Sequence, residues 1–200
     1  SPLRIGLVET TPPGSAEQPS YDSRAIALSR GSQQILEGIG AWPELARQGT
    51  TPITTIHVSD RGRFGATRLS AAEEQIEALG YVAGAAVIGR ALHDGLSRCD
   101  DLDRLAPATL IDLEQETGQI RVTLEHHGAQ RDYRCRLLVA ADGGHSTVRQ
   151  QLGLRGVQLH YGQTAVIANV LTDQPHRHRA YERFTQSGPL ALLPHDHAEG

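Results

Sequence analysis

The segment LLVAADGGHSTVRQ, residues 137–150, carries the residues best suited to border a nucleotide site. Its first five residues are apolar without alternation, which predicts a strand buried on both faces of a parallel sheet. Asp142 and Gly143 follow, and glycine lets main chain approach a ligand closely. Ser146 can cap a short helix and place Arg149 beside the turn. The segment therefore predicts one edge of a nucleotide crevice, although an Asp-Gly pair is also typical of a plain turn.

A second acid lies at the end of the first predicted strand. Residues 3–9, LRIGLVE, predict a buried strand that ends at Glu9. In dinucleotide-binding folds an acid at this place binds the ribose hydroxyls, about 20 residues after a glycine-rich turn. The sequence begins too late to contain that turn, so we expect an internal piece of a longer protein. Taken alone, Glu9 is also compatible with a solvated surface.

Hydrophobic periodicity predicts the elements that position these residues. The expected helices cover residues 32–39, 42–47 and 88–98. The expected strands cover residues 53–59, 63–69, 81–87, 109–115, 119–126, 132–136, 157–171 and 179–185. Hairpin turns are expected at 60–62 and 116–118, where glycine occurs.

Longer motifs resemble one enzyme family. The pattern Asp-Gly-x-x-Ser-x-Val-Arg, residues 142–149, resembles the second signature of the FAD-dependent aromatic-ring hydroxylases, the single-component flavin monooxygenases. The runs DSRAIAL (22–28), ITTIHVSDRG (53–62) and YERFTQSGPLALLP (181–194) are similar to the ubiquinone-biosynthesis branch of that family. The resemblance spans nearly the whole chain, from Glu9 to Pro194.

The resemblance implies an α/β fold that is α+β overall. A partial Rossmann-like FAD-binding domain is expected in residues 1–155, with inserted substrate-domain strands near 53–69. The start of an antiparallel substrate-binding sheet is expected in residues 156–200. The family's first glycine-rich turn and its later Gly-Asp segment do not occur in this sequence, which agrees with a fragment of a longer chain.

The resemblance also implies a reaction and its cofactor. FAD would be bound, NAD(P)H and O2 would be co-substrates, and a polyprenylated phenol would be hydroxylated in ubiquinone biosynthesis, alone or with other proteins of that pathway. The candidate cofactor-binding residues are Glu9, Arg24, Arg90, Asp142, Gly143 and Arg149. Arg90 is expected at the start of a helix, where an anion is favoured. No catalytic residue is identified. A flavin-fold reductase without oxygen transfer, or a non-catalytic module that binds a quinone precursor or protein partner, remains an alternative.

Composition restricts the other classes of function. The formal net charge is −4, with acids and bases interspersed, which does not favour nucleic-acid binding. The longest nearly apolar run, residues 81–89, is too short to span a membrane. Two widely spaced cysteines favour a cytoplasmic protein. The resemblance implies a polyprenylated phenol as substrate, which lies in the membrane, so a position peripheral at the inner membrane is also expected. Two His-x-His pairs lack the further ligands of a recognised metal site, so no metal is expected.

Overall fold

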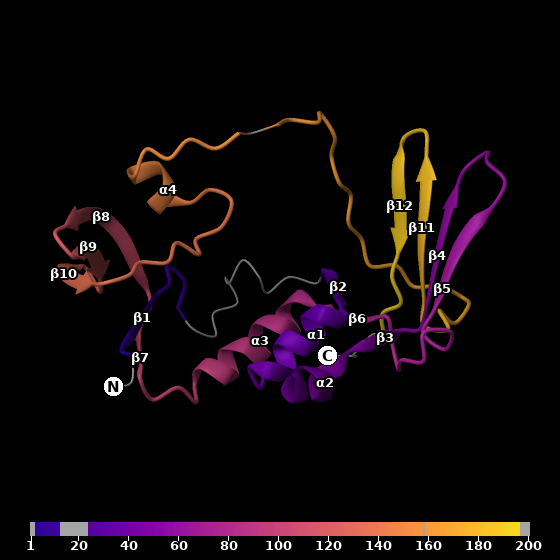
Figure 1. Cartoon of the computed structure of the whole chain (residues 1–200), viewed down its shortest axis with the longest axis horizontal. Coiled ribbons are helices and arrows are strands. Elements are labelled where there is room, and N and C mark those ends of the chain that lie inside the picture. The colour runs from indigo at the N-terminus through magenta and orange to yellow at the C-terminus, as the bar shows by residue number, and fades with distance from the viewer. Residues whose placement is uncertain (1–2, 13–23, 158, 197–200) are drawn as a thin grey trace. The chain divides into compact units, whose positions relative to one another are not determined.

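The computed structural model describes residues 3–12, 24–157 and 159–196. Contacts divide the chain into two compact units, each built from two separate stretches. The first unit combines Ser1–Gln18 with Cys99–Ala165, and the second combines Pro19–Arg98 with Val166–Gly200. Early and late residues therefore occur together in each unit, as the colours of Figure 1 show.

The first unit contains a parallel strand pair and an antiparallel sheet. β1 (Ile5–Val8) pairs in parallel with β7 (Leu102–Leu105), as expected of a Rossmann-like fold. The antiparallel sheet has the order β10-β9-β8. Its strands are β8 (Ala108–Glu116), β9 (Gln119–His126) and β10 (Ala129–Cys135). The predicted hairpin and third strand are confirmed, and the short helix α4 (Thr147–Gln151) follows them.

Two predictions of burial in this unit are wrong. β1 forms as expected, but all four of its residues are exposed. Residues 137–141 form no strand, and Leu137 and Val139 are 76% and 73% exposed. An apolar run is buried only where other elements cover it, and a strand needs a hydrogen-bonded neighbour. Within the described residues β1 has one such neighbour, β7, and residues 137–141 have none.

The core of the second unit forms around a central strand. β6 (Gly80–Gly84) lies between β2 (Ala25–Ser29) and β3 (Thr51–Ile53). Successive side chains of a strand point to opposite faces. Ala83 accordingly packs in one apolar cluster with Leu45, while Val82 packs in another with Ile53.

The described residues of this unit form three helices, and all three predicted helices are confirmed with shifted ends. They are α1 (Arg30–Gly38), α2 (Trp42–Gly49) and α3 (Ala85–Leu96). The Ser29 hydroxyl caps α1 by accepting the Ser32 N–H at 3.2 Å. Gly40 has a φ of +73° just beyond the end of α1, a conformation that suits glycine after a helix. Within the described residues, no helix is long and apolar enough to cross a membrane.

A second sheet in this unit has the order β12-β11-β4-β5. Its strands are β4 (Thr55–Asp60), β5 (Ala66–Ser70), β11 (Arg179–Thr185) and β12 (Gly188–Leu192). Both neighbouring hairpins are antiparallel, but β11 pairs with β4 in parallel, so the sheet is mixed. The pairing joins the strands near 53–69 to those after 179. The assignment of 1–155 and 156–200 to two functional domains stays a prediction.

The prediction of a strand over residues 157–171 is wrong. The described residues of this stretch, 157 and 159–171, form no strand, and Val157 and Leu171 are 93% and 95% exposed. Their apolar side chains suggested a sheet, but no described segment pairs with them. The predicted strand at 179–185 is confirmed, because β4 and β12 both pair with it.

A buried threonine holds the last described residues against β3. The Thr51 hydroxyl donates to Asp196 Oδ2 at 2.9 Å and accepts the Asp196 N–H at 2.8 Å. The other carboxylate oxygen of Asp196 lies 2.9 Å from His176 Nε2. These contacts, that of His176 first, lower the pKa of Asp196.

Loss of the Thr51 hydroxyl is expected to destabilise the protein. Thr51 is 1% exposed, so a Thr51→Val change keeps the shape but leaves the Asp196 N–H without its partner. We expect the free energy of unfolding to fall by about 1–3 kcal/mol in urea titrations. Thr67→Val, at an exposed strand position, is the control and should leave it nearly unchanged. Equal effects of both substitutions would contradict the role of Thr51.

Candidate functional site

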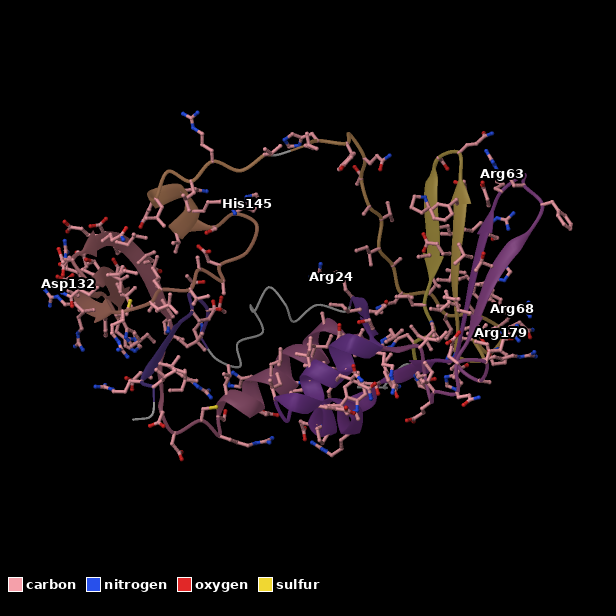
Figure 2. The ribbon with its side chains drawn as sticks, viewed as in Figure 1. Arg24, Arg63, Arg68, Asp132, His145 and Arg179 are labelled. Atoms are coloured by element: carbon pink, nitrogen blue, oxygen red, sulfur yellow. The ribbon has the colours of Figure 1, made fainter. Side chains whose placement is uncertain are left out.

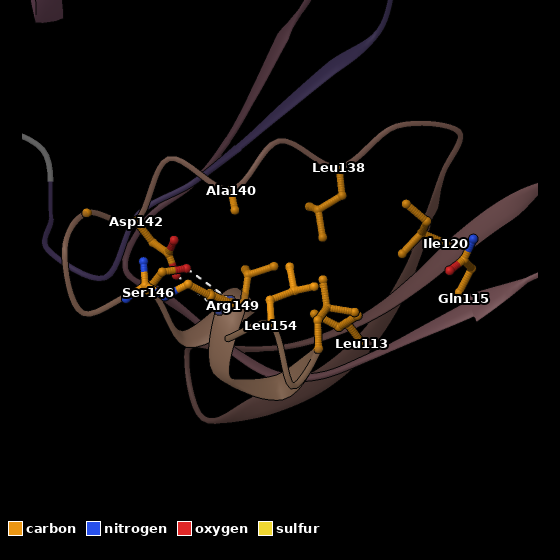
Figure 3. Close-up of a pocket in the computed structure, with 12 residues that line it drawn as sticks. Leu113, Gln115, Ile120, Leu138, Ala140, Asp142, Ser146, Arg149 and Leu154 are labelled. Carbon is orange, nitrogen blue, oxygen red and sulfur yellow. Dashed lines mark hydrogen bonds between the residues drawn. The ribbon is translucent and has the colours of Figure 1, made fainter. Parts of the chain in front are cut away.

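A pocket of about 420 Å³ in the first unit is the candidate site. One wall comes from the β8–β9 hairpin, and the other from residues 138–154, which include α4. Figure 3 shows Asp142, Ser146 and Arg149 at one end and apolar side chains toward the other. The lining residues are Leu113, Gln115, Ile120, Leu138, Ala140, Asp142, Gly143, Ser146, Val148, Arg149, Leu152 and Leu154.

The β-strand register and a side-chain hydrogen bond build this pocket. Gln115 and Ile120 are direct cross-strand partners, so their side chains share one face of the hairpin. Val148 lies on the inner side of α4 and is 9% exposed. The Gln151 side chain donates to the Ile111 carbonyl at 2.9 Å and ties α4 to β8. The pocket is thus a cleft between two elements of one unit.

The polar end of the pocket is a hydrogen-bonded turn. The Ser146 hydroxyl accepts the Arg149 N–H at 3.0 Å, as predicted for a helix cap. The Asp142 carboxylate accepts the Val148 N–H at 3.2 Å. The Arg149 guanidinium donates to the Gly144 carbonyl. Three of the predicted signature residues, Asp142, Ser146 and Arg149, are therefore brought together.

Asp142 remains ionised at neutral pH. The hydrogen bond from the Ser146 hydroxyl, followed by backbone N–H groups of the turn, holds the pKa of Asp142 below its usual value. A carboxylate has about four lone-pair positions, so some remain available to hydroxyl groups of a ligand. The Asp142 carboxylate also holds the first turn of α4, because it accepts the Val148 N–H. The role of Ser146 as a donor to Asp142 was not predicted, since the sequence gives the cap but not the side-chain distance.

Gly143 leaves the backbone of the turn accessible from one side. Its φ is +79°, in the region that L side chains rarely adopt. No atom lies within 4 Å of the position that a Cβ would occupy, so the backbone here is accessible. Conformation, rather than crowding, requires glycine at this position. A ligand can approach the main chain without meeting a side chain.

Glu9 lies in the same unit, at the end of β1. Its backbone forms hydrogen bonds to β7 and β8. The Glu9 N–H donates to the Leu105 carbonyl at 3.0 Å, and the Glu9 carbonyl accepts the Ala108 N–H at 2.8 Å. One carboxylate oxygen accepts the Thr10 hydroxyl and the Thr11 N–H at 3.2 and 3.1 Å. The predicted position beyond a parallel strand is confirmed, and the carboxylate is exposed. Its binding role stays a prediction.

The other two candidates lie in the second unit. Arg24 is exposed, and its carbonyl accepts the Ala85 N–H at 2.8 Å, beside the start of α3. Arg90 is not at a helix start as expected, because α3 already begins at Ala85. The Arg90 guanidinium donates instead to the Gln48 side chain at 3.3 Å. Arg90 therefore lacks the position at a helix start that would favour an anion. Residues 22 and 23, the first two of the DSRAIAL motif, lie outside the described residues.

The described histidines of the two His-x-His pairs are His176, His178 and His195. Within the described residues, no group of three or more His, Cys, Asp and Glu side chains could hold a metal ion. His176 instead contacts Asp196, and its Nδ1 accepts the His178 N–H at 3.0 Å. His197 lies outside the described residues.

Comparison with known proteins matches this chain to a family and to several relatives. The model of the FAD binding domain family matches residues 14–198. The chain is 32% identical to the ubiquinone hydroxylase UbiL of Rhodospirillum rubrum, over 96% of this chain and 44% of that protein. It is 31% identical to the uncharacterized protein slr1300 of Synechocystis, over 96% and 45%. The human ubiquinone biosynthesis monooxygenase COQ6 is 28% identical, over 96% and 42%. The chain thus spans less than half the length of these relatives.

Solved structures share the fold. A mutant of PqsL from Pseudomonas aeruginosa superimposes with a TM-score of 0.69 and 20% identity, over 96% of this chain and 51% of that one. Aklavinone-11 hydroxylase in complex with FAD and aklavinone gives a TM-score of 0.56 and 22% identity, over 76% and 30%. The predicted mixed fold, α/β and α+β overall, is confirmed.

Proposed function

The chain belongs to the FAD binding domain family, and from this premise we propose that its protein is an FAD-dependent aromatic-ring monooxygenase of ubiquinone biosynthesis. The substrate would be a polyprenylated phenol, with NAD(P)H and O2 as co-substrates. The names of the relatives UbiL and COQ6 support this pathway. The sequence resembles 2-polyprenyl-6-methoxyphenol hydroxylase in particular. The observation that carries the proposal is the family match together with the Asp142–Gly143 turn at the polar end of the pocket.

The residues of the first unit fit the polar groups of FAD. Asp142 and Glu9 present carboxylates, which accept hydrogen bonds from ribose or ribityl hydroxyls. Gly143 allows main chain to approach the cofactor, and Arg149 keeps guanidinium donors beyond the one bound to Gly144. In the second unit, Arg24 and Arg90 would supply positive charge to a phosphate or to the flavin ring. When bound, FAD supplies the redox chemistry that uses NAD(P)H and O2 to hydroxylate the ring.

The chain's own residues would bind and orient rather than react. The ionised carboxylate of Asp142 accepts hydrogen bonds. It carries no proton to donate at neutral pH, because its pKa is lowered. The leucines that line the pocket make its other end apolar. We further propose that the protein is cytoplasmic and binds peripherally to the inner membrane. There it would reach prenylated substrates and other ubiquinone-biosynthesis proteins.

Purification of the intact protein tests this proposal. We expect a yellow protein that releases FAD on denaturation and oxidises NAD(P)H at least several-fold faster when a prenylated phenol is added. Mass spectrometry should detect a product heavier by one oxygen atom, labelled from ¹⁸O2. A flavoprotein that consumes NAD(P)H without hydroxylated product would be a reductase. A protein that binds no flavin under any condition would be the non-catalytic binding module.

A further inference from the structure

A β-bulge in β8 decides which side chains of the hairpin face the pocket. Leu110 and Asp112 each have a partner on β9, but Ile111 between them has none, so it is the extra residue of the bulge. An extra residue reverses the alternation of side chains along the strand beyond it. Leu113 and Gln115 therefore lie on the same face as Leu110, whereas a strand without the bulge would place them on the opposite face.

Burial and ion pairs agree with this assignment. Leu113 is half-buried, while the bulged residue Ile111 is 41% exposed. The opposite face of the sheet carries charged side chains. There Arg121 contacts Glu114 and lies 3.8 Å from Asp132, which Figure 2 labels. The bulge therefore places Leu113 on the pocket face and Glu114 on the charged face.

The bulge is also the point at which α4 is attached to the sheet. The side-chain amide of Gln151, at the end of α4, donates to the Ile111 carbonyl at 2.9 Å. The two residues are 40 positions apart in the sequence, so this hydrogen bond joins the two walls of the pocket. The residue that sets the pocket face of β8 is therefore the same residue that binds α4.

The helix α4 depends on such contacts because it is short. It has five residues, and helices of this length are not stable on their own. At its start, the Asp142 carboxylate accepts the Val148 N–H, and the Ser146 hydroxyl accepts the Arg149 N–H. At its end, Gln151 binds the bulge. A movement of the last residue would therefore displace the two N–H groups that orient the turn before the helix.

We propose that Gln151 is a positioning residue of the FAD site, which acts through the Ile111 carbonyl and α4 on the carboxylate of Asp142. This role rests on the proposed function, because it takes FAD as the ligand of the pocket. Gln151 is not one of the residues that line the pocket, so it affects the ligand through the position of the turn. The sequence pattern does not indicate this role, because the bulge depends on the register of β8 against β9.

Substitution of Gln151 in the intact protein tests this role. Gln151→Met keeps the length of the side chain but cannot donate a hydrogen bond, whereas Gln151→Lys keeps a donor of similar reach. We expect FAD titrations to give an affinity about three- to fivefold lower for Gln151→Met, the effect of one hydrogen bond, and an affinity near that of the wild type for Gln151→Lys. Gln150→Met and Gln150→Lys make the same changes at the neighbouring exposed position of α4 and should bind FAD like the wild type.

Two further measurements separate positioning from a general loss of stability. In a double-mutant cycle, Gln151→Met should lower the FAD affinity by at most about twofold when Asp142 is already replaced by alanine, because the residue through which it acts is then missing. Hydrogen exchange of the flavin-free protein should be faster over residues 147–152 in Gln151→Met and unchanged there in Gln150→Met.

The possible outcomes distinguish this role from the proposed function. Equal losses of FAD affinity from Gln151→Met with and without the Asp142 carboxylate would overturn the role of Gln151. Wild-type FAD affinity of Gln151→Met, with faster exchange in α4, would also overturn it, because the hydrogen bond would then stabilise the helix only. Failure of the wild type to bind flavin would overturn the proposed function and this role with it, and is recognised separately because the wild type is titrated first.

Discussion

Replacement of Gly143 by valine is expected to lower FAD affinity of the intact protein at least tenfold and to destabilise the first unit. Gly143 has a φ of +79°, which a β-branched residue adopts only at high cost. Strain of this kind costs about 1–3 kcal/mol or shifts the turn. A shifted turn would move Asp142 and the start of α4. Flavin fluorescence titration and urea unfolding measure the two effects.

The neighbouring glycine provides a matched control. Gly144 is also free of atoms within 4 Å of a Cβ, but its φ is not positive. Gly144→Val keeps the carbonyl that accepts from Arg149 and should have a much smaller effect on both measurements. Equal effects of the two valines would show that bulk, and not the left-handed conformation of Gly143, decides the behaviour of this turn.

Loss of the Asp142 carboxylate is expected to have the second large effect. Asp142→Ala removes the acceptor of the Val148 N–H and the proposed acceptor of a cofactor hydroxyl. Asp142→Asn keeps one neutral acceptor oxygen, so it should retain α4 while losing the charge. We expect FAD affinity to fall at least tenfold in the alanine variant and several-fold in the asparagine variant. Wild-type FAD affinity in both variants, with reduced thermal stability in the alanine variant, would leave Asp142 a structural residue only.

The pH dependence of the Asp142 contribution has a definite sign. Its pKa in the folded protein lies below the ordinary value of 3.8, chiefly because Ser146 donates to the carboxylate. The stabilisation from Asp142 is therefore fully present above pH about 3.8 and is lost as the pH falls through the lowered pKa. Ser146→Ala should move this loss to higher pH. Acid unfolding curves of the wild type and Ser146→Ala compare the two midpoints.

The sequence by itself determined the local elements and the chemistry of the turn. Alternating and helical periodicity is a property of short segments, so the β4–β5 and β8–β9 hairpins and the helices α1, α2 and α3 were predicted. The Asp-Gly-x-x-Ser-x-Val-Arg pattern located the turn because Gly143 and the Ser146 cap depend on local backbone geometry. The periodicity did not locate the helix ends. α3 begins at Ala85, three residues before its predicted start, so Arg90 does not lie at the helix start.

Only the tertiary structure decided which apolar runs are covered and which side chains share a face. Residues 137–141 and 157–171 have the composition of strands, but pairing depends on distant segments, and none of the described segments pairs with them. The distribution of charged side chains over the faces of a sheet is decided in the same way. Charges of both signs alternate along the sequence, and the pairing of β4 with β5 and β11 sorts Arg68, Arg179 and Arg183 onto one side. Amino-acid composition does not show which face a charged side chain lies on, because it contains no information about strand register.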